Sequence, residues 1–302
     1  MDEQAIVSME EVTYVRDGFV LGPLNISIPK GYVTAVVGPN GSGKSTLFQM
    51  LLGLCNPSTG QITLDGQLLT NECKEQYKQE IGYLPELPWA HESYMRGKEK
   101  VSFYKSVFSN WNSTYYEQLR EKLQIDDQLR LDKMSKGMRR KLDFIIALAH
   151  EPNLLLLDEP SSGLDPLAWK EMIEILHQYM EQEERSIVIS SHIVEEVRRL
   201  ADYILFVHQG KIVGFFEKDE LFNKWCAYII FDREISEQQL YGLPGVRKIE
   251  IERGGTYTIV TSEALAVEQW LQEQRLQSVT RTALDLDEIL FYLIQPQKSQ
   301  EV

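Results

Sequence analysis

The sequence feature that most constrains the fold is a glycine-rich segment between a short apolar run and a helical stretch. The apolar run covers residues 32–37, is rich in β-branched side chains and is typical of a buried strand. The helical stretch covers residues 47–54. A strand before and a helix after form the context in which the pattern G-x-x-x-x-G-K-[ST] marks a phosphate-binding loop, whereas a chance glycine turn lacks both. The segment consists of Gly38, Pro39, Asn40, Gly41, Ser42, Gly43, Lys44, Ser45 and Thr46.

The residue types in this loop suit the binding of ATP. Glycines let consecutive backbone N–H groups turn toward phosphate oxygens, and the helix N-terminus adds its positive dipole end. Lys44 is expected to reach the β- and γ-phosphates, and the hydroxyl of Ser45 to bind Mg²⁺.

A second signal is the apolar run 154–157, which ends in two carboxylates, Asp158 and Glu159. A strand that ends in acidic residues is a weak signal alone, because charged residues commonly terminate strands. Downstream of a phosphate-binding loop, it predicts that Asp158 holds the Mg²⁺ shell and that Glu159 orients and polarises the attacking water.

Strands and helices alternate through the first two thirds of the chain, which favours a parallel sheet in a three-layer α/β domain. Antiparallel strands are expected near the N-terminus, and the helix-periodic segment 88–134 is interpreted as a helical subdomain inserted into the sheet domain. The predicted elements are strands 4–14, 24–29, 32–37, 154–158 and 187–191 and helices 47–54, 138–150, 166–182 and 193–200.

The pattern changes near residue 217, which divides the chain into predicted domains 1–217 and 218–302. The second domain has the order βαββαβ, which indicates a small α+β domain of ferredoxin-like type. Its expected strands are 226–231, 246–252, 256–261 and 277–282, and its expected helices are 236–240, 263–274 and 285–294.

Over residues 5–216 the chain resembles the ABC ATPases, a family of P-loop NTPases. Residues 134–138 (MSKGM) lie about twenty residues before Asp158, where this family has its signature LSGGQ. The resemblance implies that Ser135 and Gly137 contact the γ-phosphate of an ATP held by the opposite subunit. Taken alone, the same residues would form an ordinary helix N-cap at Ser135.

Two further residues take a role from this resemblance. Residues 161–165 look like the D-loop, with Asp165 contacting the partner subunit. His192 follows the strand 187–191 and resembles the switch histidine that contacts the γ-phosphate. The end of that strand is the edge of an α/β sheet where ligands bind, although a lone histidine after a strand is more often structural or solvated.

The chain departs from the family pattern at two places. Glu86 stands where the family has the glutamine of its Q-loop, and its carboxylate could approach Mg²⁺ or the water around it. Arg16 stands where an aromatic side chain normally stacks on adenine. A guanidinium plane can also stack on a base, so Arg16 is the expected contact to adenine, and Tyr14 is interpreted as part of the strand.

Basic residues gather just after the signature segment and are interpreted as the solvated face of its helix, with a role in docking or near phosphate as the alternative. These residues are Lys136, Arg139, Arg140 and Lys141.

The resemblance implies ATP hydrolysis in an ATP-sandwiched dimer, formed with a second copy or with a paralogous ATPase. The segment 284–293 resembles the closing helix of bacterial ABC-2-type exporter ATPases, which implies export of antibiotics, peptides or lipid-linked precursors through a separate transmembrane permease. No apolar run approaches the ~20 residues that span a bilayer, and no signal peptide is found. We therefore expect a cytoplasmic protein that is peripheral on the inner face of the cell membrane.

Two rival functions fit the sequence less well. A soluble ABC-type ATPase that remodels ribosomes or nucleic acid would usually carry two ATPase domains or long coiled coils. A net charge of −14 also makes nucleic acid a poor partner. A metabolic P-loop kinase would explain the phosphate-binding loop, but not the segments around Ser135, Asp165 and His192 together.

Overall fold

The computed structural model describes residues 4–72, 74–88, 92–182, 184–231, 235, 237–252, 255–274 and 279–295. The chain forms two compact units, Met1–Ile212 and Val213–Val302. The division falls within strand β10 (Lys211–Glu217), and the domain boundary placed after residue 217 from the sequence stays a prediction. In the described residues, no helix is long and apolar enough to cross a membrane.

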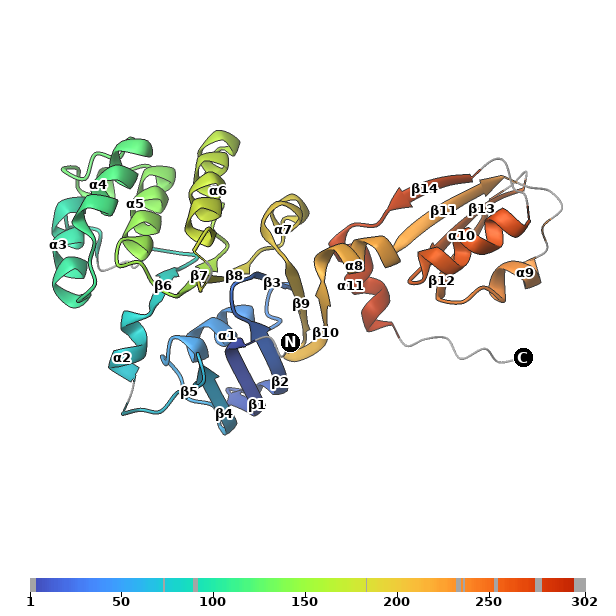
Figure 1. Cartoon of the computed structure of the whole chain (residues 1–302), viewed down its shortest axis with the longest axis horizontal. Helices are drawn as coiled ribbons and strands as arrows, with labels where there is room; N and C mark the ends of the chain where they lie inside the picture. The colour runs from blue at the N-terminus through green and yellow to red at the C-terminus, as the bar shows by residue number, and fades with distance from the viewer. Residues whose placement is uncertain are drawn as a thin grey trace. The chain divides into compact units, whose positions relative to one another are not determined.

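The first unit is built on a six-stranded sheet with the strand order β10-β9-β3-β8-β7-β6 (Figure 1). Neighbouring strands from β9 to β6 run parallel, so the carboxyl ends of β3, β7 and β8 meet at one edge. Every residue of these three strands is buried, as expected for parallel strands that are covered on both faces. The bounds are β3 Val33–Val37, β6 Ile81–Leu84, β7 Leu154–Asp158, β8 Ser186–Ser190 and β9 Tyr203–His208.

Two further layers cover this sheet (Figure 1). On one side lie α1 (Lys44–Leu51) and an antiparallel sheet of order β2-β1-β4-β5. On the other side lie α5 (Lys136–Leu148), α6 (Pro166–Met180) and α7 (Val194–Leu200). The antiparallel strands are β1 Ala5–Arg16, β2 Phe19–Pro29, β4 Thr59–Leu64 and β5 Gln67–Leu68. The predicted three-layer α/β architecture with an antiparallel subdomain is thereby confirmed.

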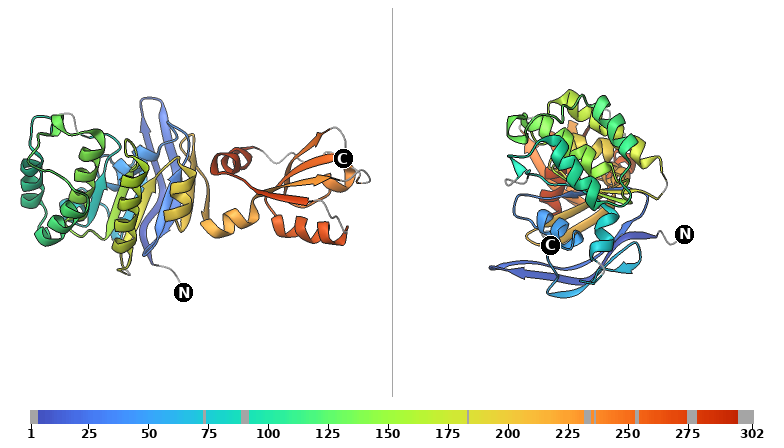
Figure 2. Two further views of the ribbon diagram at one scale, coloured as in Figure 1. Left: turned by 90° about the horizontal axis from the view of Figure 1, so that it is seen from above. Right: turned by 90° about the vertical axis from the view of Figure 1, so that its left-hand side faces the viewer.

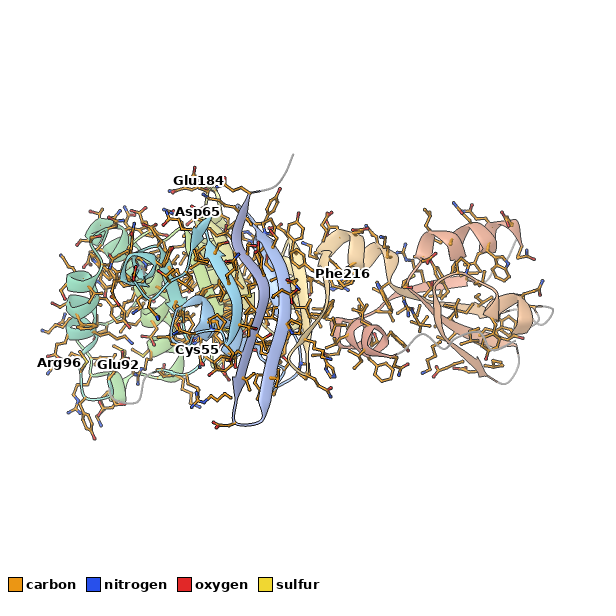
Figure 3. All side chains as sticks on the ribbon, turned by 90° about the horizontal axis from the view of Figure 1, so that it is seen from below. Cys55, Asp65, Glu92, Arg96, Glu184 and Phe216 are labelled. Carbon is orange, nitrogen blue, oxygen red and sulfur yellow. The ribbon has the colours of Figure 1, made fainter. Side chains whose placement is uncertain are left out.

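The region read as a helical subdomain contains α3 (Gly97–Val107), α4 (Ser113–Lys122) and a short 3-10 helix, η2 (Leu131–Lys133). In the chain, α2 (Lys74–Gln79) comes first, β6 follows it, and the helical region comes after β6. A buried charge network ties this region to α5. Lys100 pairs with Asp143 at 2.9 Å and with Glu92, a residue labelled in Figure 3, and Arg139 pairs with Glu92 at 3.3 Å.

The second unit confirms the predicted ferredoxin-like order. Its sheet has the order β12-β13-β11-β14, and all neighbours are antiparallel. Each helix connection between parallel strands therefore skips one strand, which defines the split βαβ arrangement. The elements after α8 (Lys218–Lys224) are β11 Cys226–Phe231, α9 Glu237–Tyr241, β12 Val246–Glu252, β13 Thr256–Thr261, α10 Ala264–Glu273, β14 Val279–Ala283 and α11 Leu286–Ile294.

The core of this unit lies between one face of the sheet and its helices, with α10 alongside the strands in Figure 2. Tyr228 and Ile259 from the sheet pack with Val267 and Leu271 from α10 and with Leu240 from α9. Position 236 of the predicted helix and positions 277–278 of the predicted last strand lie outside the described residues.

Candidate functional site

The phosphate-binding loop turns tightly between β3 and α1. Gly43 caps α1 with a φ of +112°, a conformation that side chains other than hydrogen strongly disfavour. A Cβ at this position would lie 2.8 Å from Cδ1 of Leu21 and 3.2 Å from Cζ of Phe19. The helix therefore starts at Lys44, three residues earlier than predicted, and Ser45 and Thr46 lie in its first turn.

Lys44 folds back over the loop. Its Nζ donates to the carbonyl oxygens of Gly38 at 2.7 Å and Pro39 at 3.3 Å, and the residue is buried. Within the described residues, the buried hydroxyl of Ser42 has no hydrogen-bond partner. The loop thus combines a buried cation, a hydroxyl left over for a further hydrogen bond and a helix N-terminus, a combination that suits an oxyanion.

A cavity of about 390 Å³ opens beside this loop and gathers most of the predicted site residues. It is lined by Phe19, Asn40, Gly41, Gly43, Lys44, Ser45, Thr46, Glu86, Asp158 and Glu159. These residues come from β2, the loop, α1, the segment after β6 and the end of β7. A second cavity, of about 260 Å³, lies near β4, α2 and the start of β7, and no predicted site residue lines it.

The end of β7 is fixed by Ser190 on the neighbouring strand. The Ser190 hydroxyl donates to the carboxylate of Asp158, and the amide N–H of Glu159 donates to both Ser190 oxygens at 3.1 Å. Glu159 has a φ of +46°, a left-handed conformation that costs about 1–3 kcal/mol for such a residue. The surrounding hydrogen bonds hold this strained backbone.

Glu159 and His192 form a close pair, with 2.8 Å between Oε2 and Nδ1. The carboxylate side chain is 11% exposed and the imidazole 68% exposed, so the histidine lies on the solvent side. Burial raises the pKa of Glu159, while His192 and Lys44 act in the opposite direction. The pair can hold a carboxylate in a fixed orientation toward the cavity and lets it accept a proton from a water there.

The oxygen ligands around the cavity fit Mg²⁺. Ser45, Asp158 and Glu86 contribute a hydroxyl and two carboxylates, which are the hard ligands that Mg²⁺ prefers. Across the described part of the chain, no cluster of three or more His, Cys, Asp or Glu side chains could hold a metal by itself. A magnesium ion at this place therefore needs phosphate oxygens and water to complete its shell.

The other residues carried over from the family resemblance cap helices away from this cavity. Ser135 accepts a hydrogen bond from the amide of Met138 at 3.1 Å and caps α5. Asp165 caps α6 by accepting from two amides at 2.9–3.0 Å, and these bonds lower its pKa. A Cβ on Gly137 would lie 3.5 Å from the carbonyl oxygen of Gly163, so the start of α5 faces the segment 161–165.

The aromatic neighbour of the cavity is Phe19, which the sequence reading missed. Arg16, the predicted contact to adenine, is not among the cavity-lining residues. Its guanidinium is exposed, and hydrogen bonds with Tyr14 and Asp17 raise its pKa. Arg16 and Phe19 face each other across a two-residue hairpin turn, so a prediction of this turn would have placed the aromatic residue on the facing strand.

The interpretation of the basic cluster as a solvated face holds for the exposed Lys136 and is wrong for the other three members, whose side chains are largely covered. Arg140 is 5% exposed, and its guanidinium points into the protein among backbone carbonyls. The Arg139 side chain is 12% exposed and pairs with Glu92. The Lys141 side chain is 19% exposed and pairs with Glu171 at 3.2 Å.

Comparisons with known proteins agree with this geometry. The sequence profile of the family described as ABC transporter matches residues 21–162. The bacitracin transport ATP-binding protein BcrA of Bacillus licheniformis is 33% identical over 217 residues, which are 71% of this chain and 70% of that protein. The lantibiotic transport ATP-binding protein SrtF of Streptococcus pyogenes is 34% identical over 216 residues, covering 69% of this chain and 92% of that protein.

A solved structure of an ATP-binding subunit of an ABC transporter shares its fold with the matched part of this chain. It is 26% identical, superposes with a TM-score of 0.64, and the match covers 72% of this chain and 91% of that one.

Proposed function

The chain belongs to the family of ABC transporter ATP-binding subunits, whose members bind and hydrolyse ATP, and from this premise we propose that it drives export through a separate membrane-spanning partner. In this proposal, ATP closes a dimer of two ATP-binding subunits, and hydrolysis opens it again. The partner in the dimer is a second copy of the chain or a paralogous ATPase.

The proposal rests on one observation: some predicted site residues line the cavity, whereas the signature residue Ser135 does not. Lys44, Ser45, Asp158 and Glu159 line one cavity. Ser135 is exposed at the start of α5 and is not among the residues that line it. A γ-phosphate bound at Lys44 would therefore have to meet the signature segment of another subunit.

Within one subunit, the side chains suggest a sequence of events. Lys44 exchanges the carbonyls of Gly38 and Pro39 for phosphate oxygens when ATP binds. Glu159 then accepts a proton from the attacking water, and His192 fixes its orientation. Mg²⁺ held by Ser45 and Asp158 would neutralise charge on the phosphates, with Glu86 near its water shell.

Dimer closure follows from a difference in affinity. ATP that touches Lys44 of one subunit and Ser135 of the other binds the closed dimer more tightly than the open one, so ATP shifts the population toward closure. Loss of the γ-phosphate removes that bridge. Asp165 is exposed and is proposed to contact the partner subunit beside its phosphate-binding loop.

Export is proposed from the relatives that the chain resembles. BcrA and SrtF are named for transport of bacitracin and of a lantibiotic. We infer a peptide antibiotic or a related amphipathic compound as cargo, and a location on the inner face of the cell membrane through the permease.

The proposal is tested by purifying the Glu159→Gln variant from detergent-solubilised native membranes with ATP and Mg²⁺ present. This change removes the base and should leave nucleotide binding intact, so the closed complex accumulates. We expect a polytopic membrane protein to co-purify in a fixed ratio. The matched control is Glu195→Gln, because Glu195 is an exposed residue paired with Arg199 on α7. Recovery of ribosomal material or of a soluble dimer alone would contradict the proposed transport function.

A further inference from the structure

Arg140 is a buried cation close to the candidate site that the proposed chemistry leaves unused. It lies on α5, five positions after the capping residue Ser135, and is 5% exposed. Burial lowers the pKa of its guanidinium, which nevertheless stays charged because an arginine side chain is not deprotonated in proteins. Among the residues that the structure describes, no carboxylate forms an ion pair with it. A buried charge in this situation is costly, so the contacts of this side chain require an explanation.

All five N–H donors of this guanidinium have a backbone carbonyl as acceptor. Nε donates to Pro160 at 3.0 Å, and Nη2 donates to Asp158 at 2.6 Å and to Glu159 at 2.7 Å. Nη1 donates to Glu86 at 3.1 Å and also to Pro85. A guanidinium has five donors in a rigid plane, so every one of them is used.

The five carbonyls belong to two segments that are far apart in the sequence. Pro85 and Glu86 follow the end of β6, and the other three lie at and after the end of β7. β6 and β7 end at or next to these residues, and carbonyls beyond the last hydrogen bonds of the ladder need another donor. Arg140 supplies this donor to both segments at once, from α5, the helix that Ser135 caps.

The strained backbone of Glu159 is held from two sides as a result. Ser190 accepts from its amide N–H, and Arg140 donates to its carbonyl oxygen. The left-handed φ of Glu159 directs the carboxylate toward His192, so a shift of this peptide would move the carboxylate away from the water that it orients.

We propose that Arg140 is a positioning residue of the hydrolytic site: it holds the backbone that carries Glu159 and Glu86 and joins both to α5, the helix that Ser135 caps. The inference rests on the proposed function, because there Ser135 meets the ATP of the partner subunit. When Ser135 contacts the ATP of the partner subunit, Arg140 therefore links that contact to the position of Glu159, the base of its own subunit.

The test compares Arg140→Gln, Arg140→Lys and Arg139→Gln in the full chain, with kcat, KM, ATP affinity and the thermal midpoint measured for each. Since a misplacement of about 1 Å can cost about 100-fold in rate, we expect Arg140→Gln to lower kcat about 100-fold while KM and ATP affinity change less than about threefold. Lysine has three donors, so Arg140→Lys should lie between wild type and Arg140→Gln. Arg139→Gln breaks a buried ion pair on the same helix without touching these carbonyls, and should lower the thermal midpoint but not kcat.

The inference is overturned if kcat falls only in step with ATP affinity and thermal midpoint, or if Arg139→Gln lowers kcat as much. Should Arg140→Gln fail to fold, Arg140→Lys decides alone: an unchanged kcat overturns the inference, and a lower kcat at unchanged KM supports it.

A double-mutant cycle tests whether Arg140 acts through Glu159. In a Glu159→Gln background, Arg140→Gln should lower the residual turnover by less than about threefold, because coupled residues are not additive. A full additional loss would overturn the inference. A wild-type chain without turnover would refute the proposed function itself, whereas normal turnover in Arg140→Gln would refute only the inference.

Discussion

Among single residues, Glu159 has an environment with a direct consequence for the pH dependence of hydrolysis. Burial raises the pKa of its carboxyl above the ordinary value of 4.5, and the imidazole at 2.8 Å opposes this shift. Only the deprotonated carboxylate accepts a proton, so kcat should rise with pH through this raised pKa. Replacing His192 with alanine removes the opposing group, and the acid limb of the profile should move to higher pH.

The measurement is kcat at saturating ATP from pH 5.5 upward for wild type and His192→Ala. Glu195→Gln serves as the surface control and should leave the profile unchanged. An acid limb at the same pH in wild type and His192→Ala would show that this contact does not set the protonation of the base.

The adenine contact is a second question at this scale. Phe19 lines the cavity and Arg16 does not. Since stacking of a base on an aromatic side chain contributes about 1–3 kcal/mol, Phe19→Ala should weaken ATP binding about 5- to 160-fold. Arg16→Ala should change it less than about twofold, the size expected for an exposed side chain paired with its neighbour Asp17. Titration calorimetry measures the ATP affinity of both variants. A larger loss of affinity in Arg16→Ala than in Phe19→Ala would show that Arg16 is the contact to adenine.

The sequence predicts the site residues that are positioned by local structure, and it does not predict those that are positioned by distant contacts. Lys44, Asp158 and Glu159 follow from short motifs, because a loop or strand end positions them locally. Phe19 depends on how a hairpin turns. Arg140 depends on carbonyls about 20 and 55 positions away, so no local pattern could show that it is buried.

Among the elements, long apolar runs were predictable and short interrupted ones were not. β7 is buried along its whole length, and its four consecutive leucines predict a buried strand from the sequence alone. β6 has four residues and contains Gly82, a residue that strands disfavour. A Cβ on Gly82 would lie 2.3 Å from the carbonyl oxygen of Ala147, so the glycine is there to let α5 approach, which only tertiary packing reveals.

The junction of α3, α5 and β6 gives a prediction on stability. His150 follows α5, stacks on Phe108 with ring centroids 3.8 Å apart, and has Nε2 3.2 Å from the carbonyl oxygen of Ile81. Burial lowers its pKa from the ordinary 6.5 to about 4. Between these values the unfolded chain binds a proton that the folded chain excludes, so stability is complete above pH 6.5 and falls as the pH drops.

Wild type should therefore lose about 1 kcal/mol more of its free energy of unfolding than His150→Phe between pH 7.5 and 5.5. Phenylalanine keeps the stacking area but cannot be protonated. The free energies are measured by denaturant unfolding at both pH values. Equal losses in the two proteins would mean that His150 is protonated without cost in the folded state.

For the whole molecule, the net negative charge acts against formation of the proposed dimer. Each chain carries a net charge of −14, so two copies repel at long range. Contacts through ATP at Lys44 and Ser135 act only at short range. The balance between the two therefore depends on ionic strength.

We predict that the ATP-bound dimer of Glu159→Gln becomes tighter as salt rises from 50 to 300 mM. Salt shortens the Debye length from roughly 14 Å to roughly 6 Å, which screens the repulsion between the two surfaces while the partly buried contacts around ATP are screened less. Sedimentation velocity at several protein concentrations gives the dimer affinity at each salt concentration, and the same chain without nucleotide should stay monomeric throughout. If salt weakens the dimer instead, oppositely charged patches at the interface outweigh the net charge, and the acidic surface is then placed away from the subunit contact.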